Sequence, residues 1–446
     1  MLCRVSQPSR PDSEKRTSLL AGLSIAADFR RDLIAILGLF VTLRVVLGVL
    51  GALLWYTNKL PGPCHFELAL DGWTVFPPLD DQGIAFPLVG VWERWDGCWY
   101  TNIAANGYVM KDSVSFWPLY PAFASFAGQL LGGDIALGGM IVNGVAYVLA
   151  MVGLVRLVRL DFGRRVADRT VLFISVFPAA FYFFAPFSEA VFLASAVWAI
   201  YGARQHLWLV AGVAAMLAGF SRIQGIFLML PIGWEAVRYW WLRGLPPTDE
   251  AESRRFAGWN FAHGRARVAG VLARLPHWRV PAWPDLLAPV LAVALPLLAF
   301  ATFMVYAKSV TGQTPFESQS LWGGTNYHAP WETLTVAWNW AAEHHEVVVL
   351  LNVVVLAGFL VGIVVGLFRL PLSYSLFAAP QVLIAAIRIQ PTPLTSTLRL
   401  MLVVFPVFVL ISLGCKDRRI ERAWLLLSTV LLAYLVSLYF QGDFVA

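Results

Sequence analysis

The sequence predicts an all-α polytopic membrane protein with about 11 transmembrane helices. Of its 446 residues, 59% are hydrophobic and only 13% are charged, and the mean hydropathy is +0.67. These values lie outside the range of ordinary soluble globular proteins. Apolar runs of about 15 to 25 residues recur along the chain, and many could cross a hydrocarbon core of roughly 30 Å as helices. A β-barrel would instead show short segments of alternating polarity.

The N-terminal part of the sequence predicts a tail, a first span and a long loop. Residues 1–32 form a tail rich in Ser and Arg, for which we expect a cytoplasmic position and little fixed structure. The apolar run from about Leu33 to Tyr56 is longer than that of a cleavable signal, which indicates a retained first span. Residues 57–113 carry three Lys or Arg against seven Asp or Glu, so we expect this first loop to be extracytoplasmic. It contains Cys64 and Cys98, which are either a disulfide pair or two unrelated thiols.

Two apolar pieces, 116–131 and 135–155, connect this loop to a cluster of arginines that we expect in the cytoplasm. The cluster comprises Arg156, Arg159, Arg164, Arg165 and Arg169. An outside loop and an inside cluster require an odd number of crossings. One piece therefore does not span, and "FWPLYPAF" with its two prolines is the better candidate for a re-entrant or interfacial element.

Apolar runs further along the chain predict nine more spans. They lie at about 170–185, 190–203, 206–220, 223–242, 285–307, 346–368, 371–387, 400–414 and 423–440. A single transmembrane domain then covers residues 33–440, with a cytoplasmic basic loop at 243–281, an extracytoplasmic loop at 308–345 and an extracytoplasmic tail at 441–446. We interpret the basic loop as a contact with anionic lipid that also anchors the topology.

The stretch "WERWDGCWY", residues 92–100, places Glu93 and Asp96 among aromatic side chains. Low polarity raises the pKa of a carboxyl toward the strength of a general base, which suits removal of a proton from an alcohol. Asp96 is therefore a candidate base. The alternative is a loop carboxylate beside Arg94, with the aromatic residues anchoring the loop among lipid headgroups.

Arg222 in "AGFSRIQGI" and Arg399 in "TSTLRLMLV" lie beside apolar segments, where an unpaired guanidinium is costly. A guanidinium binds phosphate oxygens bidentately and keeps its charge, so both residues are candidates for binding a phosphate. The alternative is that each side chain extends to the outer headgroups. Two such arginines on one predicted face favour the phosphate site.

Two further polar groups are candidates for binding a sugar. Ser188 and Glu189 in "FSEA" place a hydroxyl and a carboxylate at the start of a predicted helix, where they either cap the helix or bind a carbohydrate. His328 lies in "WGGTNYHAPWE", a mixture of Gly, Asn and aromatic residues that suits carbohydrate stacking or an acceptor gate. A turn-rich loop has the same composition.

A set of motifs in this order resembles the PIG-V family of mannosyltransferases, which includes the second mannosyltransferase of GPI-anchor biosynthesis. The motifs are "RWDGCWYTNIAANGYV", "SFWPLYPAF", "FPAAFYFFAPFSEAVFLAS", "AGFSRIQGIFL" and "STLRLMLVVFPVF", between Trp92 and Phe408. Trp117 stands where the family pattern would have Phe. The resemblance implies a GT-C-type glycosyltransferase whose first extracytoplasmic loop carries the catalytic carboxylate and whose donor is a polyprenyl-phosphate sugar.

By this resemblance Asp96 is the catalytic base, and Arg222 and Arg399 contact the donor phosphate. The remaining candidates for substrate binding are Glu93, Trp95, Tyr100, Ser188, Glu189, Gln224 and His328. The implied reaction moves mannose, with inversion, from a polyprenyl-phosphate mannose donor to a hydroxyl of a glycolipid or glycan acceptor on the extracytoplasmic or luminal face. Arginine charge would stabilise the departing lipid phosphate, so no cofactor or metal is expected. Asp80 and Asp81 stay as alternative bases or ligands of a divalent metal.

Two other classes of function are compatible with a polytopic chain of this kind. A transporter or flippase of lipid-linked sugars would also need arginines on the outer face, but it should place charges near the middle of several spans. Only Arg44, in the first predicted span, lies there. A non-catalytic scaffold subunit would use the aromatic residues for packing and would tolerate replacement of Asp96.

Overall fold

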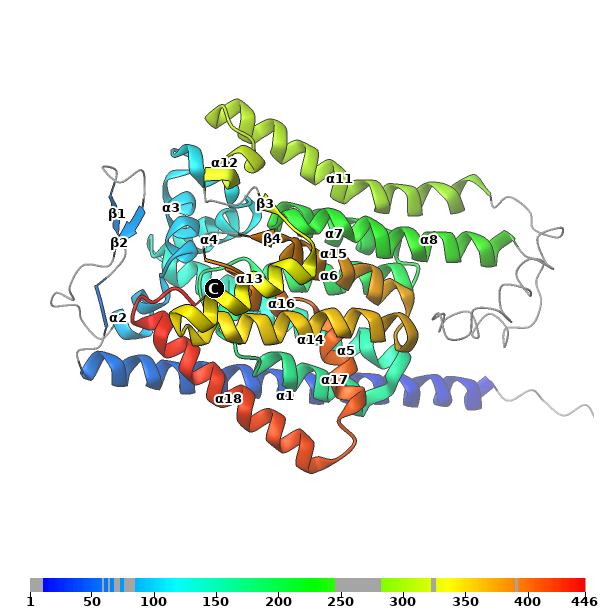
Figure 1. The fold of residues 1–446 in the computed structure, drawn as a ribbon. Helices are drawn as coiled ribbons and strands as arrows, with labels where there is room; N and C mark the ends of the chain where they lie inside the picture. The colour runs from blue at the N-terminus through cyan, green and yellow to red at the C-terminus, as the bar shows by residue number, and fades with distance from the viewer. Residues whose placement is uncertain are drawn as a thin grey trace, which may run out of the picture.

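The computed structural model describes residues 11–57, 60–62, 65–67, 73–75, 85–244, 282–321, 326–389 and 392–445. These residues form a bundle of helices, many of which run lengthwise beside one another (Figure 1). Among them, five segments are long and apolar enough to cross a membrane: Ala27–Tyr56, Ile135–Ser175, Asp285–Thr311, Val347–Arg369 and Arg418–Phe440. The shorter apolar helices are Trp208–Ser221, Leu372–Ile387 and Phe405–Gly414. An integral, multi-pass, all-α protein is thereby confirmed, while the count of 11 crossings stays a prediction.

The helices follow one another in this order: α1 (Pro11–Tyr56), α2 (Ala85–Leu88), α3 (Asp96–Asn106), α4 (Leu119–Leu130), α5 (Ile135–Ser175), α6 (Glu189–Arg204), α7 (Trp208–Ser221), α8 (Met229–Gly244), α11 (Trp283–Thr311), α12 (Pro315–Leu321), α13 (Pro330–His344), α14 (Val347–Arg369), α15 (Leu372–Ile387), α16 (Thr397–Leu402), α17 (Phe405–Gly414) and α18 (Arg418–Phe440). Short 3₁₀ helices lie at Gly90–Trp92, Lys111–Ser115, Ala180–Phe183 and Ile223–Leu228. Strand β1 (His65–Glu67) pairs antiparallel with β2 (Trp73–Val75), and β3 (Asn326–Tyr327) with β4 (Arg388–Ile389).

Helix α1 begins well before the first predicted span, so the expectation of little fixed structure in residues 1–32 is wrong from Pro11 onward. Proline suits the first turn of a helix. The Leu and Ala residues that follow are strong helix formers. Within the span, Arg44 has partners: its Nη1 donates to the carbonyl of Phe184 at 3.4 Å, and its Cζ lies 4.6 Å from the ring centroid of Trp92.

Helix α5 joins what the sequence predicts as two separate spans, 135–155 and 170–185. The helix breaks sharply at Gly163, whose φ of 76° and ψ of 180° suit glycine but not other residues. The arginine cluster after Val155 is therefore helical. The helix that was predicted at 170–185 ends early, at Ser175, because Pro178 and Pro186 break it and leave a 3₁₀ turn before α6.

Helix α4, from "FWPLYPAF", has only 12 residues, or about 18 Å of length, which is too short for a hydrocarbon core of roughly 30 Å. This agrees with the prediction that the piece does not span. It packs against α3 and α5, beside the segment that holds Asp96. The ring of Trp117, just before α4, packs at a tilt of 47° against that of Phe303 of α11, with ring centroids 4.7 Å apart.

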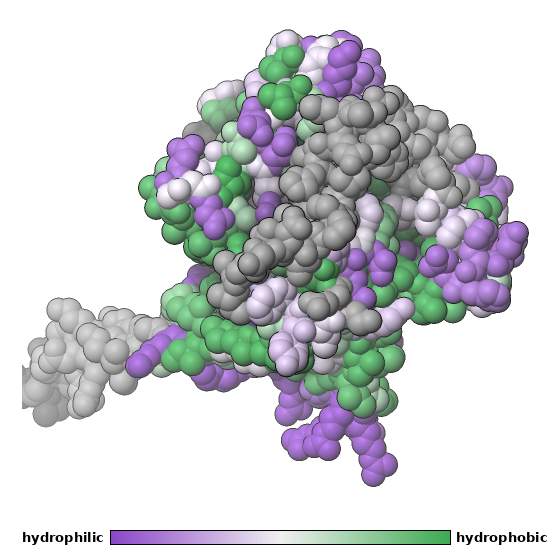
Figure 2. Space-filling model, turned by 90° about the vertical axis from the view of Figure 1, so that its left-hand side faces the viewer, coloured by the Kyte–Doolittle hydropathy of each residue, from purple (hydrophilic) through white to green (hydrophobic). Residues whose placement is uncertain are grey.

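Helix α3, which begins at Asp96, lies at one end of the bundle. In Figure 1, α2, α3, α4 and the last turns of α18 lie toward the left, whereas α1 begins at the right. Figure 2 faces the left end and shows hydrophilic groups (purple) interspersed with hydrophobic surface (green).

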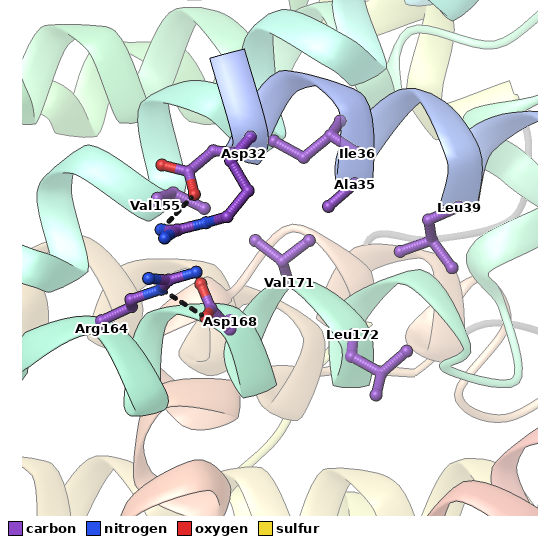
Figure 3. A pocket seen from close by; sticks show the side chains of 10 residues that line it. Asp32, Ala35, Ile36, Leu39, Val155, Arg164, Asp168, Val171 and Leu172 are labelled. Atoms are coloured by element: carbon purple, nitrogen blue, oxygen red, sulfur yellow. Dashed lines mark hydrogen bonds and ion pairs between the residues drawn. The ribbon is translucent and has the colours of Figure 1, made fainter. Parts of the chain in front are cut away.

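A separate pocket between α1 and α5 is shown in Figure 3. It is lined by Arg31, Asp32, Ala35, Ile36, Leu39, Val155, Arg164, Asp168, Val171 and Leu172. None of these residues is a predicted site residue.

Candidate active site

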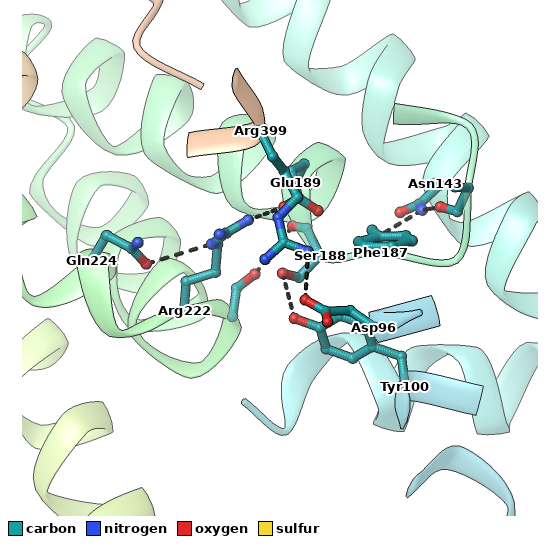
Figure 4. Close-up of polar contacts among 11 residues, drawn as sticks. Asp96, Tyr100, Asn143, Phe187, Ser188, Glu189, Arg222, Gln224 and Arg399 are labelled. Carbon is teal, nitrogen blue, oxygen red and sulfur yellow. Dashed lines mark hydrogen bonds and ion pairs between the residues drawn. The ribbon is translucent and has the colours of Figure 1, made fainter. Parts of the chain in front are cut away.

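Four charged side chains from four distant segments meet in one cluster, shown in Figure 4. Arg399 Nη1 donates to Asp96 Oδ2 at 2.5 Å, and Arg399 Nε lies 3.3 Å from Glu189 Oε1. Arg222 Nη1 donates to the same Glu189 oxygen. Glu189 thus bridges the two guanidinium groups, Asp96 holds one of them, and the formal charges of the four side chains cancel.

The two carboxylates differ in their access to solvent. The Asp96 side chain is 26% exposed, whereas the Glu189 side chain is 1% exposed and enclosed by its two arginines. The remaining oxygen of Glu189, Oε2, is buried without a hydrogen-bond partner among the described residues. Asp96 is therefore the carboxylate of this cluster that an incoming group can reach.

The sequence "WDG" positions Asp96 by local geometry. Asp96 is the first residue of α3, where the helix dipole stabilises a negative side chain. Gly97 lies against the turn before α6: a Cβ at this position would approach Pro186 Cγ to 3.1 Å and Phe187 Cε2 to 3.2 Å. Glycine therefore permits the close approach that brings Asp96 toward Glu189.

The "FSE" turn is held from two sides. Asn143 of α5 donates to the carbonyl of Phe187 at 2.9 Å and to that of Ala185. The hydroxyl of Ser188 lies 2.9 Å from that of Tyr100, on α3. Ser188 stands at the N-cap of α6 but makes no capping bond there, so the expected capping role is wrong for its hydroxyl, which instead joins α3 to α6. Burial raises the pKa of Tyr100 to about 12, so its phenol stays neutral near pH 7.

Arg399 is fixed by its backbone and its surroundings. Asn352 Oδ1 accepts a hydrogen bond from the backbone N–H of Leu398 at 3.1 Å, and the guanidinium lies over the rings of Tyr182 and Phe187 at 5.8 and 5.4 Å. Burial lowers the pKa of Arg399, but the carboxylates of Asp96 and Glu189 outweigh this effect and raise it. The guanidinium therefore keeps its charge inside the protein.

Arg222 has a second contact, with its neighbour Gln224. The distance from Arg222 Nε to Gln224 Oε1 is 3.4 Å, and the carbonyl of Gln224 accepts from Gln381 Nε2 at 3.4 Å. The Arg222 and Arg399 side chains are only 10% and 12% exposed. The alternative in which these arginines extend to lipid headgroups is therefore wrong for both.

Other predicted site residues lie apart from the cluster. Arg94 does not pair with Asp96; its buried guanidinium donates to the carbonyls of Pro61, Gly62 and Phe440. Burial raises the pKa of Glu93.

Trp95 and His328 also contact other parts of the chain. The indole of Trp95 donates to the carbonyl of Asp443 at 3.1 Å. His328 Nδ1 lies 3.3 Å from Glu332 Oε2, and the ring is half-exposed. No hydrogen bond or ion pair within the described residues joins either side chain to the Asp96 cluster.

The cysteines and the alternative carboxylates are placed only in part. Cys98, two residues after Asp96, is disulfide-bonded, while Cys64, which by the sequence is either its partner or an unrelated thiol, lies outside the described residues. Asp80 and Asp81 also lie outside them. Within the described part of the chain, no group of three or more His, Cys, Asp or Glu side chains is arranged to hold a metal ion.

Sequence reasoning missed Asn143 and Asn352, the two residues that hold the Glu189 and Arg399 segments. Both are nearly inaccessible, at 0% and 2% exposure. The sequence could have indicated both residues, because each is a lone amide side chain inside an apolar run, "MIVNGVA" and "VLLNVVV". A polar side chain inside a span needs a partner and often marks a functional region.

Comparison with solved structures identifies proteins with a similar helical arrangement. The chain is similar to ArnT from Cupriavidus metallidurans bound to undecaprenyl phosphate, with 11% identity over 92% of this chain and 76% of that one, at a TM-score of 0.47. It is also similar to the Archaeoglobus fulgidus oligosaccharyltransferase in complex with Zn and sulfate, with 12% identity over 78% of this chain and 49% of that one, at a TM-score of 0.39. The aligned region thus spans about half the length of the oligosaccharyltransferase.

Comparison of sequences gives one family and no curated relative. No curated protein matches the chain significantly. Residues 34–237 match the family model described as mannosyltransferase (PIG-V). This segment contains Asp96, Glu189 and Arg222, whereas Arg399 lies beyond it. By this match, residues 34–237 are similar to the mannosyltransferase (PIG-V) family, the resemblance that the motifs in the same part of the chain predicted.

Proposed function

We propose that this protein is a GT-C-type mannosyltransferase that moves mannose from a polyprenyl-phosphate donor to an acceptor hydroxyl, with inversion, on the extracytoplasmic or luminal side of a membrane. The family match of residues 34–237 supports glycosyl transfer by a membrane protein. The observation that carries the more specific proposal is the cluster itself. It combines an accessible carboxylate, Asp96, with two buried guanidinium groups, Arg222 and Arg399, beside membrane-length helices.

In this proposal the arginines bind the donor phosphate. Guanidinium groups bind phosphate oxygens bidentately, and their charge stabilises a departing phosphate without proton transfer. Glu189 holds Arg222 and Arg399 through one oxygen, so the two guanidinium groups are oriented before the donor arrives. Pre-arranged charge of this kind costs no reorganisation during the reaction.

Asp96 acts as the base. It accepts the proton of the acceptor hydroxyl while the hydroxyl oxygen forms a bond to the anomeric carbon of mannose. The bond from that carbon to the phosphate oxygen breaks, and the electron pair leaves with the lipid monophosphate. Attack from the face opposite the leaving phosphate inverts the anomeric carbon. The greater exposure of Asp96 relative to Glu189 supports this assignment of roles.

The test is transfer of radiolabelled mannose in liposomes containing the purified protein, polyprenyl-phosphate mannose and a glycolipid or glycan acceptor extract. Wild type is compared with Asp96→Asn, which keeps the size of the side chain but removes its basicity. Asp134→Asn is the matched control, since Asp134 is an exposed N-cap of α5 and Asn caps a helix as well as Asp does.

We expect transfer by wild type and by Asp134→Asn, and a loss of about 100-fold or more with Asp96→Asn, because about 100-fold is the lower end of the usual contribution of a general base. Equal transfer by all three proteins would remove Asp96 from the reaction. Movement of labelled donor across the bilayer with no product in any of them would favour a transporter of lipid-linked sugars.

A further inference from the structure

The C-terminal end of the chain packs directly on the segment that carries Asp96. We define the C-terminal clamp as Tyr439, Phe440, Asp443 and Phe444. The hydroxyl of Tyr439 donates to the carbonyl of Trp92 at 2.7 Å. The carbonyl of Phe440 accepts from Arg94 Nε at 3.3 Å. Two of the clamp residues thus fix the backbone and a buried side chain just before Asp96.

The other two clamp residues hold Trp95, the residue immediately before Asp96. The carbonyl of Asp443 accepts from the Trp95 indole at 3.1 Å, and the ring of Phe444 meets the indole edge to face, with centroids 5.1 Å apart. Figure 1 shows the C-terminus at the same end of the bundle as α3. The contacts span more than three hundred residues of sequence.

Trp95 needs such support because of its backbone. Its φ is 53° and its ψ is −119°, and a positive φ is unfavourable for a residue with a bulky side chain. A conformation of this kind persists only when the surroundings hold it in place. It also determines where α3 begins, since Trp95 is the N-cap and Asp96 the first helical residue.

We infer that the C-terminal clamp is a positioning device for Asp96, which acts by holding Trp95 in its strained conformation. This inference rests on the proposed function, in which Asp96 is the base. The clamp makes no hydrogen bond or ion pair with Arg222 or Arg399 within the described residues, and those arginines are fixed from α6 and α14 instead. Weakening the clamp should therefore reduce kcat and leave the KM for the donor unchanged.

The experiment compares Phe444→Ala, Phe444→Tyr and Phe126→Ala with wild type. Phe444 is 41% exposed, so its truncation should leave the protein folded, and Tyr restores a ring that can pack on Trp95. Phe126 is a 65% exposed aromatic residue of α4 and serves as the matched control. Two quantities are measured: the steady-state kinetics of mannose transfer, and deuterium uptake by backbone amides of residues 92–100.

For Phe444→Ala we expect faster deuterium uptake in residues 92–100 and a kcat lower by about 10- to 100-fold, the scale of a small misplacement of a catalytic group. Phe444→Tyr and Phe126→Ala should resemble wild type in both measurements. Unchanged uptake in Phe444→Ala would overturn the clamp, and faster uptake with unchanged kcat would overturn its role in positioning. Faster uptake in a protein whose wild type transfers no mannose would support the clamp and contradict the proposed function.

Discussion

Arg399 Nη1 lies 2.5 Å from Asp96 Oδ2, although 303 positions separate the two residues in the sequence. The same guanidinium also approaches Glu189, so one side chain connects the exposed carboxylate to the buried one. A donor phosphate would compete with Asp96 for Arg399, because both are anionic acceptors of guanidinium hydrogen bonds. Under the proposed function, donor binding would then free Asp96 to accept a proton.

Replacement of Arg399 by Lys should weaken donor binding. Arg399 contacts Asp96 and Glu189 through two different nitrogens, whereas a lysine has a single nitrogen and cannot bind a phosphate bidentately. We expect the KM for polyprenyl-phosphate mannose to rise by at least about tenfold, equivalent to about 1.4 kcal/mol. Initial rates over a range of donor concentrations measure this change. Arg422→Lys, at an exposed position near the start of α18, is the control, and an unchanged KM for Arg399→Lys would exclude the phosphate role.

Glu189→Gln should destabilise the fold. The change leaves Arg222 without its buried carboxylate partner, and breaking a buried ion pair on one side costs about 3 to 5 kcal/mol. The double variant Glu189→Gln/Arg222→Gln should cost less than the sum of the two single variants, because no uncompensated charge stays inside. Reversible denaturation in detergent micelles gives all three free energies of unfolding. Strict additivity would show that the two side chains do not interact.

The raised pKa of Glu93 predicts that the stability of the folded protein depends on pH. Burial raises its pKa in the folded protein above the ordinary value of 4.5. The unfolded state therefore loses the proton first as the pH rises, and the folded state becomes less stable from about 4.5 through the raised pKa. Gln resembles the protonated side chain and cannot titrate. The thermal midpoint of Glu93→Gln, measured relative to that of wild type, should thus increase as the pH rises above about 4.5. A difference that is constant across this range would contradict a raised pKa.

Replacement of the buried residue Asn352 by Leu should lower the activity of the site. The change removes the oxygen that accepts a hydrogen bond from the backbone N–H of Leu398, the residue before Arg399. A lost buried bond of this kind is worth about 1 to 3 kcal/mol, and we expect a fall in kcat/KM of at least about tenfold. Asn352→Asp keeps an acceptor oxygen at the same position and should retain more activity than Asn352→Leu. Equal activity of Asn352→Leu and wild type would show that this bond does not position Arg399.

Part of the site was predictable because its residues are conspicuous in their local sequence. Asp96, Arg222 and Arg399 are charged residues beside apolar runs, where burial of a charge is costly, so each stands out without knowledge of the fold. The first span was predictable for a similar reason, since apolar length is a local property of the chain. The motifs added a resemblance to the PIG-V family, and residues 34–237 match the model of that family.

Other features depended on contacts between distant segments. No local pattern indicates that Ser188 bonds to Tyr100 instead of capping α6, or that Asp96 pairs with Arg399 instead of Arg94. The break at Gly163 within one long helix was also hidden, because the arginines around it favour a helix as readily as a cytoplasmic loop.

Consecutive residues are enough to indicate that this protein is helical, crosses a membrane and carries PIG-V motifs, because hydropathy and motifs are local properties of the chain. Which charged side chains meet depends instead on how the chain folds. The tertiary structure joins Asp96, Glu189, Arg222 and Arg399 into one neutral cluster and brings Phe444 onto Trp95. The physical reason is that a buried ion pair or a strained backbone is stable only when its partners are supplied by packing, and those partners lie tens to hundreds of residues away.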